Sequence, residues 1–332
     1  MLTRILQSAT FRFQTAVILI LGMLFSAAPL IAQTAYPSRT ISMVVAFNAG
    51  GSTDLIARVL AQHMGSILGQ TVLVENKGGA DGAIGTAGVT RATPDGYTII
   101  LSTTSTHVIN PLLYKDIAYN PSKDFEPVSL VAQSPNILVS SPKFDAKSVA
   151  DVIARAKAAP GKLNVATGAT MHLLNAAMFK SMAGLSWVDV PYKGSGPAIN
   201  DLLSGQMDLL FDQMPSSLVQ IKGGSGLKAV AVTSRKRSPL APDIPTIAES
   251  GLPDFEATSW WAVFAPPKTP PDIVAKLNAA IKQSLTDPKL LATFSDMGLE
   301  ASPSTPDELA KLLVDERVKW QKVIADNNIA IN

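Results

Sequence analysis

Three short segments rich in glycine and hydroxyl side chains carry most of the chemistry in this sequence. They are Ala-Gly-Gly-Ser-Thr at 49–53, Thr-Gly-Ala-Thr at 167–170 and Lys-Gly-Ser-Gly at 193–196. Each segment leads into residues with helical spacing, so each would present the first N–H groups of a helix, which have no partner within that helix. Glycine lets the backbone approach a ligand, and the hydroxyl groups add further donors. Such a set of donors suits a small carboxylate.

The same composition has a second explanation, because loops between strands and helices often contain Gly, Ser and Thr for turn formation and helix capping alone. Three such segments together favour a ligand site, although composition does not show that they meet in space. The first segment comes early in the chain and the other two come from a later part. A ligand held by all three would connect two parts of the molecule and link their closure to binding.

Several ionisable side chains lie near these segments, and each has two interpretations. Asp54 and Asp212 follow strand-like residues, where a carboxylate can cap a helix or orient a ligand. His172 and His107 could each donate to an anion or be ordinary structural residues. Lys193 could line a cleft or its rim, because the glycine spacing of a phosphate loop is missing upstream. The candidate ligand-binding residues are Asn48, Ala49, Gly50, Gly51, Ser52, Asp54, Ser102, Thr104, Ser105, His107, Gly168, Ala169, Thr170, His172, Tyr192, Lys193, Gly194, Ser195 and Asp212.

Enzymatic signatures are scarce in this sequence. It contains no cysteine, so no thiolate can act as a nucleophile or metal ligand, no disulfide can form and no lipidated cysteine can anchor the chain. G-x-S-x-G, H-E-x-x-H and a helix-opening G-x-G-x-x-G are absent. The three histidines lack acidic neighbours at zinc-ligand spacing, so we expect no metal and no cofactor. A hydrolase of small esters or amides that uses Ser52 or Ser195 with a histidine stays an alternative.

The residues around these segments predict strands and helices in alternation. Apolar, β-branched runs predict strands, and apolar residues at three- and four-residue spacing predict helices. In the first part of the chain we predict strands at 41–47, 71–75 and 97–102, and helices at 55–68 and 83–91. In the second part we predict helices at 148–158, 171–182 and 197–203, and strands at 163–166, 187–190, 207–211 and 227–232. A strand at 259–265 and helices at 271–285, 288–297 and 306–326 complete the chain.

This alternation indicates an α/β fold in two lobes, with parallel sheets and helices on both faces. We interpret the proline-rich stretch 239–253 as part of a crossing between the lobes, and the last three helices as packing back on the first lobe. The first lobe is then discontinuous, with residues 33–133 and 258–332, and the second lobe has residues 134–257. Ligands of such sheets bind beyond the carboxyl ends of the strands, where the three segments lie.

The N-terminal residues predict export. Arg4 and Arg12 precede an apolar run at about 16–30 and then small residues, which is the pattern of a secretory signal peptide, here 1–32 with cleavage after Ala32. The run is shorter than the roughly 20 residues of a spanning helix, and retention as a membrane anchor is the alternative. The chain has 28 basic and 26 acidic residues, and cleavage would remove Arg4 and Arg12 but no acidic residue. This balance argues against nucleic acid as a partner.

Further motifs resemble those of the tripartite tricarboxylate transporter substrate-binding receptors, the Bug family. They are Tyr-Pro-Ser-Arg at 36–39, Val-Glu-Asn-Lys-Gly-Gly-Ala at 74–80, Pro-Asp-Gly-Tyr-Thr at 94–98 and Val-Pro-Tyr-Lys-Gly-Ser at 190–195. The resemblance implies a type II periplasmic binding protein fold, with two α/β lobes and a central cleft that closes like a Venus flytrap. It also implies that a ligand carboxylate is held by backbone amides and ordered waters at the first segment and at the Gly168 loop.

The same resemblance implies a periplasmic receptor without catalytic activity, whose partners are a small carboxylate and the membrane permease subunits of a tripartite transporter. Its members take up di- and tricarboxylates, amino acids or aromatic acids. A receptor that presents its ligand to a sensor kinase is an alternative that the sequence does not separate from an uptake receptor. We expect a monomer. Met171 stands where the family more often has a small hydroxyl residue, which favours a more apolar acid.

Overall fold

A computed structural model describes residues 36–144, 146–327 and 329 of the chain. Residues 37–332 form one unit by their contacts, and the fold below is that of this unit. The predicted signal peptide at 1–32 and its alternative, a membrane anchor, lie outside the described residues. None of the helices within the described ranges is long and apolar enough to cross a membrane.

The apolar runs form strands that hydrogen-bond in the order β2-β1-β3-β9-β4-β7-β5-β6, with β8 and β10 also paired to β4. β2, β1 and β3 are parallel neighbours, and so are β7, β5 and β6. The sheet is nevertheless mixed rather than parallel as predicted, because β4 and β9 run antiparallel to their partners. The strands are β1 (Ile41–Val45), β2 (Val72–Asn76), β3 (Thr98–Thr103), β4 (Glu126–Ser140), β5 (Asn164–Thr167), β6 (Val188–Pro191), β7 (Leu209–Gln213), β8 (Lys228–Val232), β9 (Thr258–Ala265) and β10 (Glu300–Ala301).

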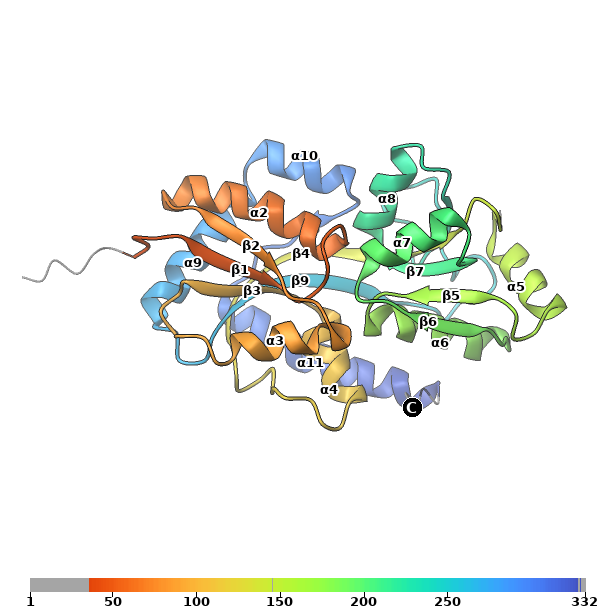
Figure 1. Cartoon of the computed structure of the whole chain (residues 1–332), viewed down its shortest axis with the longest axis horizontal. Coiled ribbons are helices and arrows are strands. Elements are labelled where there is room, and N and C mark those ends of the chain that lie inside the picture. Colours follow the sequence, from red (N-terminus) through yellow and green to blue (C-terminus); the bar gives the residue numbers. More distant parts are fainter. Residues whose placement is uncertain (1–35, 145, 328, 330–332) are drawn as a thin grey trace, which may run out of the picture. The chain divides into compact units, whose positions relative to one another are not determined.

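The long strand β4 belongs to both ends of this sheet. Its residues 126–135 pair with β9, whereas residues 136–140 pair with β7 and β8. It thus carries the chain from a first half, with β1, β2, β3, β9 and β10, to a second half, with β5, β6, β7 and β8 (Figure 1). The sequence analysis missed this strand because Pro127 and Pro135 are atypical of strand interiors.

Helices cover both faces of each half. In the first half, α2 packs against α9 and α10 on one face of the sheet, and α3, α4 and α11 lie on the other face (Figure 1). In the second half, α7 and α8 contact each other on one face, and α6 lies on the other face (Figure 1). The predicted α/β fold is confirmed in this respect. The helices are α2 (Ser52–Leu68), α3 (Ala83–Val89), α4 (Asn110–Leu113), α5 (Val149–Ala158), α6 (Thr170–Ala183), α7 (Ser195–Ser204), α8 (Met214–Lys222), α9 (Pro271–Ser284), α10 (Pro288–Asp296) and α11 (Pro306–Asp326), with a 3-10 turn η1 (Ala80–Gly82) and a π-helical turn η2 (Ser105–Ile109).

The core of the second half fixes the helices that begin at the strand ends. Ile137 of β4 packs with Ile199 and Leu202 of α7 and with Leu218 of α8, and all four side chains are buried. Burial of a side chain of this size contributes about 2 kcal/mol. The spacing of Ile199 and Leu202 gives α7 one apolar face, so its first turn is held at the carboxyl ends of β5 and β7.

The proline-rich stretch has a different place from the predicted one. Residues 239–253 pack beside β8, where Val232 pairs with Thr246, so they belong to the second half. The chain crosses to the first half at Ala257, whose N–H donates to the Thr233 carbonyl and whose carbonyl accepts from the Thr233 hydroxyl. The chain therefore passes between the halves within β4 and again at Ala257, and the predicted division into two lobes stays a prediction. Movement of the two lobes as separate bodies stays a prediction.

Candidate ligand-binding site

The three glycine-rich segments meet beyond the carboxyl ends of the strands, where α2, α6 and α7 begin. A narrow cleft there is lined by residues from both halves of the fold. The free space in it is about 10 Å³, which has room for roughly one water molecule. The two halves are therefore closed on one another around this cleft. Its lining residues are Phe47, Gly51, Ser52, Thr53, Asp54, Gly168, Ala169, His172, Ser195 and Gln213.

Backbone segments of the two halves touch directly beside the cleft. The Asn48 N–H donates to the Lys193 carbonyl over 3.2 Å. A Cβ atom added to Gly196 would lie 2.5 Å from the Ala49 carbonyl oxygen, a separation that real side chains essentially never show. Gly196 is thus needed for the close approach of two backbone segments, whereas the sequence analysis expected glycine to let the backbone approach a ligand.

The helices that begin at the cleft receive no side-chain cap from their own N-cap residues. α2, α6 and α7 follow Gly51, Ala169 and Gly194, and none of these three residues makes a side-chain hydrogen bond to its helix. Among the helices that begin elsewhere, α5, α10 and α11 are each capped by their N-cap side chain, whereas α9 is not. The positive dipole ends of three helices therefore meet at one gap, which suits an anion.

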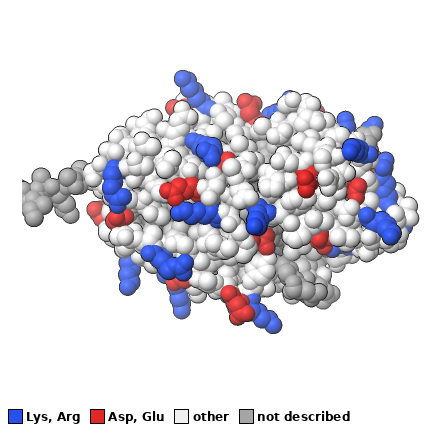
Figure 2. Space-filling view, in the orientation of Figure 1, with Lys and Arg blue, Asp and Glu red and all other residues white. Residues whose placement is uncertain are grey.

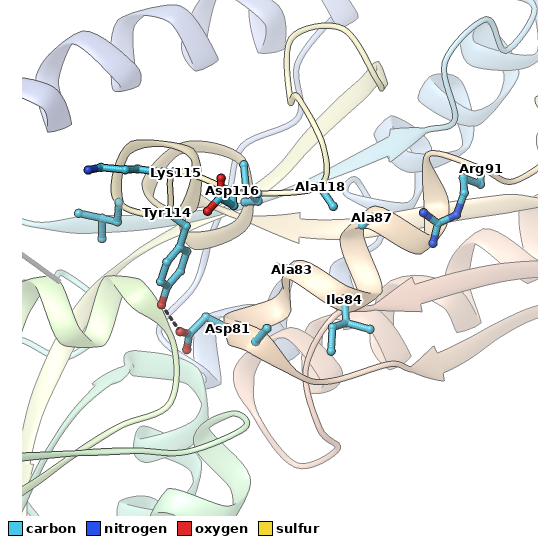
Figure 3. A pocket seen from close by; sticks show the side chains of 12 residues that line it. Asp81, Ala83, Ile84, Ala87, Arg91, Tyr114, Lys115, Asp116 and Ala118 are labelled. Atoms are coloured by element: carbon cyan, nitrogen blue, oxygen red, sulfur yellow. Dashed lines mark hydrogen bonds between the residues drawn. The ribbon is translucent and has the colours of Figure 1, made fainter. Parts of the chain in front are cut away.

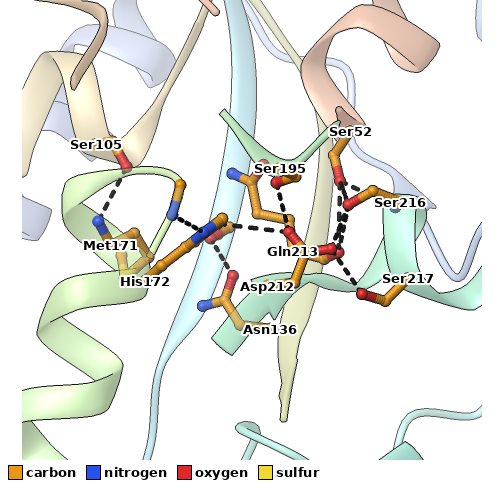
Figure 4. A network of polar contacts seen from close by, with 12 residues as sticks. Ser52, Ser105, Asn136, Met171, His172, Ser195, Asp212, Gln213, Ser216 and Ser217 are labelled. Carbon is orange, nitrogen blue, oxygen red and sulfur yellow. Dashed lines mark hydrogen bonds and ion pairs between the residues drawn. The ribbon is translucent and has the colours of Figure 1, made fainter. Parts of the chain in front are cut away.

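Asp212 is the centre of a buried polar network (Figure 4). Its carboxylate is fully buried and accepts hydrogen bonds from the hydroxyl groups of Ser195 (2.5 Å), Ser216 (2.5 Å) and Ser217 (2.6 Å). The helix-capping interpretation of Asp212 is wrong, because Gln213 occupies the N-cap position of α8 and the partners of Asp212 are hydroxyl groups. The carboxylate instead holds the start of α7 against the start of α8.

Asp54 supports the first loop from within. Its carboxylate accepts hydrogen bonds from the Gly50 N–H (3.0 Å), the Arg58 guanidinium (3.1 Å) and the Asn76 amide (3.0 Å). Burial by itself raises the pKa of Asp54, but the hydrogen bonds from these three partners outweigh it and hold the pKa below its ordinary value. The ionised carboxylate thus fixes the loop while one side of the residue lines the cleft.

His172 offers a hydrogen-bond donor at the cleft. The Gly168 N–H donates to its Nδ1 over 3.1 Å, so Nδ1 is unprotonated and Nε2 carries the hydrogen of a neutral ring. Burial lowers the pKa of His172, and the charges of Asp212 and Asp81 offset part of that effect. Nε2 lies 3.8 Å from Asp212 Oδ1 and has no hydrogen-bond partner within the part of the chain that the structure describes.

Side-chain contacts also join the two halves around the cleft. Each has one partner from the first half and one from the second, so they stabilise the closed arrangement without a ligand. They are Ser52 Oγ with Ser216 Oγ (2.8 Å), Ser105 Oγ with the Met171 N–H (3.1 Å) and Asn110 Oδ1 with the Thr170 hydroxyl (2.6 Å).

His107 lies in the core of the first half, not at the cleft as expected of a candidate site residue. Its ring stacks on Phe264 with the centroids 4.1 Å apart, and it packs against Phe125 and Tyr119. Burial lowers the pKa of His107 to about 3. Aromatic neighbours, which the sequence does not reveal, remove this residue from the site.

We expect His107→Phe to make the protein less sensitive to acid. The unfolded chain takes up a proton at His107 near pH 6.5, whereas the folded chain resists it down to about pH 3. The free energy of unfolding therefore falls as the pH drops through this window, by up to about 1.4 kcal/mol per pH unit. Urea unfolding at pH 7, 6, 5 and 4 measures the slope, which should be shallower for the variant. Equal slopes would contradict this assignment.

Four other candidates do not present a side chain to the cleft. The Tyr192 hydroxyl donates to Asp201 on α7 over 2.6 Å, and Lys193 is exposed and contributes only its carbonyl. Thr104 Oγ1 accepts from a backbone N–H of β9 over 3.0 Å. Ser102 is fully buried within β3. Hydrogen bonds to nearby groups and burial in the sheet thus explain the positions of these four residues, which were candidates only because of their residue types.

Some residues of the site were missed by the sequence analysis. Thr53 lines the cleft, and its hydroxyl accepts from the indole N–H of Trp261 over 3.1 Å, so this tryptophan supports the first loop from behind. Gln213 also lines the cleft, and its place directly after Asp212 at a strand end was the available signal. Phe47, the last apolar residue before the first loop, gives the cleft one apolar wall.

A wider hollow of about 870 Å³ lies on the first half alone (Figure 3). Ile84 and Ala87 of α3 form one wall, and Tyr114 donates to Asp81 at its edge over 2.5 Å. No residue of the second half lines it, so closure of the two halves would not enclose a ligand there. The smaller cleft, where donors from both halves converge, is therefore the candidate binding site.

Ser52 and Ser195, the candidate nucleophiles of the hydrolase alternative, make their hydrogen bonds to Ser216 and Asp212. Across the described ranges no hydrogen bond joins Ser52 or Ser195 to a histidine, because Ser195 donates to Asp212 and His172 accepts from Gly168. A serine nucleophile needs a base within hydrogen-bond reach. No cluster of three or more His, Asp or Glu side chains that could hold a metal ion occurs in the described part of the chain.

Basic and acidic side chains are interspersed on the face drawn in Figure 2. That face thus lacks the basic stripe of a nucleic-acid-binding surface.

Two α/β halves with a donor-lined cleft between their strand ends define a two-lobed solute-binding protein. Residues 56–329 match the family described as "Tripartite tricarboxylate transporter family receptor", and the chain therefore belongs to this family. It is 40% identical to "Protein BugT" of Bordetella pertussis over 304 residues, which cover 90% of this chain and 92% of that one. The resemblance to the Bug family is thereby confirmed.

Solved structures give the same result for the fold. The chain is 35% identical to "R. palustris Rpa4515 with adipate", with a TM-score of 0.86, over 89% of this chain and 99% of that one. It is 33% identical to MatC from Rhodopseudomonas palustris with bound malate, with a TM-score of 0.83, over 87% of this chain and all of that one. The predicted periplasmic binding protein fold is thus confirmed.

Proposed function

We propose that this protein is a periplasmic receptor that binds a small organic acid through a carboxylate and delivers it to the membrane subunits of a tripartite transporter, without chemical change. One observation carries the proposal. The N-termini of α2, α6 and α7, which come from both halves and have no cap from their own N-cap residues, converge on one narrow gap. A small anion that fits between the loops is the ligand that can interact with all three positive helix ends at once.

The closed arrangement explains how binding would be reported to a partner. An acid that accepts hydrogen bonds from both halves stabilises the closed form more than the open one, because its contacts exist only when the loops meet. A permease that recognises the closed surface then engages only loaded receptor. Adipate in Rpa4515 and malate in MatC are the acids seen in related proteins, and they support a carboxylate as the ligand class here.

We expect a thermal-shift panel of small acids to identify at least one that stabilises the protein. A ligand that binds only the folded state adds about 2.7 kcal/mol at 100 times its Kd, which corresponds to a rise in Tm of roughly 5 °C for a chain of this size. Each acid is paired with its neutral amide, for example succinate with succinamide, and the amide should have no effect. The proposal fails if no acid shifts the Tm, or if acids and amides shift it equally.

The hydrolase alternative is tested on the same samples. Mass spectrometry after incubation with a small model ester and its acid product should show no turnover above buffer. Ester hydrolysis that disappears in Ser52→Ala or Ser195→Ala would replace the receptor proposal with an enzymatic one.

A further inference from the structure

The hollow of about 870 Å³ on the first half has the character of a ligand pocket separate from the cleft (Figure 3). Pockets for small organic molecules have volumes of roughly 300 to 1,000 Å³ and mostly apolar walls. Ala83 and Ala87 of α3 share one face of the helix and are small enough to leave space in front of it. Ile84 beside them is 63% exposed, and Leu113 and Ile117 also line the hollow. An apolar chain placed there would remove this surface from water.

The charged residues of the hollow favour one anionic end. Figure 3 shows Arg91 at one end of the hollow and Lys115 at the other, with the α3 wall between them. Both are exposed, and neither makes a hydrogen bond or ion pair within the described ranges of the chain. Asp116 lies at the Lys115 end and offsets that charge, whereas the other lining carboxylate, Asp81, accepts from Tyr114. The Arg91 end therefore has an unbalanced positive charge, which suits a carboxylate.

The edge of the hollow is connected to the closed cleft through Asn110. Ala80 and Asp81 have φ angles of 47° and 50°, a conformation that non-glycine residues rarely adopt, so their turn persists because neighbours hold it. Asn110 Nδ2 donates to the Asp81 carbonyl over 2.9 Å, and its Oδ1 accepts from the Thr170 hydroxyl of the second half over 2.6 Å. One buried amide thus joins the edge of the hollow to the start of α6. A ligand that packs on this edge favours the position of Asn110 that the closed form uses.

We propose that this hollow is a second ligand site, for an acid with one carboxylate and an elongated apolar chain, and that its occupation tightens binding in the cleft. The carboxylate lies at Arg91, and the chain follows α3 toward Tyr114. Because coupling between two binding sites is reciprocal, the acid in the cleft strengthens binding in the hollow by the same factor. Occupation of the hollow is independent of the proposed function, whereas the coupling rests on it.

Isothermal titration of the unaltered protein with butyrate, hexanoate and octanoate tests the site. Each CH₂ group that leaves water strengthens binding about threefold to fourfold, so we expect octanoate to bind roughly tenfold more tightly than hexanoate. Octanamide should bind about threefold more weakly than octanoate, because an exposed ion pair contributes little. Absence of saturable octanoate binding, or an affinity that does not rise with chain length, overturns the site. Equal binding of octanoate and octanamide overturns the carboxylate as its ligand.

Substitutions at the two ends of the proposed contact locate the bound chain. Ile84→Glu places a charge in the apolar wall and should weaken octanoate binding at least about tenfold. Val314→Glu is the matched control, because Val314 is 62% exposed on α11 and does not line the hollow, and it should have no effect. Arg91→Gln should weaken octanoate about threefold and leave octanamide unchanged. Octanoate binding that neither Ile84→Glu nor Arg91→Gln alters lies elsewhere and overturns the site.

The coupling is measured with the acid that the thermal-shift panel identifies, titrated with and without saturating octanoate. We expect its affinity to rise about fivefold, and the affinity for octanoate to rise by the same factor in the reverse titration. A fall in both titrations would show that octanoate competes for the cleft, which overturns the site. Unchanged affinities overturn the coupling.

Thr170→Val assigns the coupling to Asn110. The variant keeps the shape of the side chain and removes the hydroxyl that Asn110 accepts from, so the coupling factor should fall to about one while octanoate still binds. A factor that stays near five overturns Asn110 as the connection. If no acid binds in the cleft of the unaltered protein, the proposed function fails and the coupling with it, whereas the Ile84 and Arg91 variants still decide whether the hollow is a site.

Discussion

Gly196→Ala is expected to weaken acid binding at least about 100-fold, which is roughly 2.7 kcal/mol, while leaving the ligand-free protein folded and stable. The added Cβ would lie 2.5 Å from the Ala49 carbonyl oxygen. The carbonyl oxygen is a backbone atom and the position of Cβ is fixed by the backbone, so no side-chain rotation relieves the clash. Because Ala49 belongs to the first half and Gly196 to the second, the clash disappears when the halves separate. The substitution therefore opposes closure, not folding.

The stability of the ligand-free variant separates these two effects. Gly196 is near the start of α7, where alanine costs nothing by helix propensity and gains up to about 1 kcal/mol over glycine. Isothermal titration with the acid identified in the panel measures affinity, and thermal unfolding without ligand measures stability. Gly88→Ala is the matched control, because nothing lies within 4 Å of a Cβ at that position. If both variants bind the acid equally well, the contact between the loops does not govern closure.

The sequence predicted the elements that carry a clear apolar period. The helix expected at 306–326 coincides with α11 (Pro306–Asp326), and the strand expected at 259–265 differs from β9 (Thr258–Ala265) by one residue. It also predicted the loops of the site, because a buried strand, a glycine-rich turn and a helix start follow one another in these segments. The local sequence was sufficient to predict these helices, strands and loops, because interactions between residues that are close in the chain determine them.

The parts that were missed depend on residues far apart in the chain. His107 was a candidate because of its type, yet its packing against Phe264 is a contact over more than 150 residues that no local pattern contains. The bond between Ser52 and Ser216 likewise joins two halves of the fold.

Asp212→Ala is expected to lower the free energy of unfolding by about 3 kcal/mol. Hydrogen bonds to a charged group contribute about 1.5 to 3 kcal/mol each, and the variant loses three of them. Removal of the buried charge offsets part of this loss in the free energy of unfolding, because the desolvation cost of the charge, several kcal/mol, is no longer present. We expect the lost hydrogen bonds to outweigh the saved desolvation cost, because three buried serine hydroxyls lose the Asp212 carboxylate as their acceptor. The starts of α7 and α8 then lose their common anchor.

Urea unfolding measures this difference, with the m-value as the check that both variants unfold the same structure. Asp212→Asn keeps the volume and one carbonyl oxygen, so we expect it to lose about half as much as the alanine variant. Asp254→Ala, at an exposed position, should change stability by less than about 0.5 kcal/mol. Because Ser216 joins Asp212 to Ser52 of the first half, Asp212→Ala should also weaken acid binding, whereas the exposed control should not. An alanine variant as stable as the control would mean that desolvation of Asp212 cancels its hydrogen bonds, and that the network positions the loops without stabilising the fold.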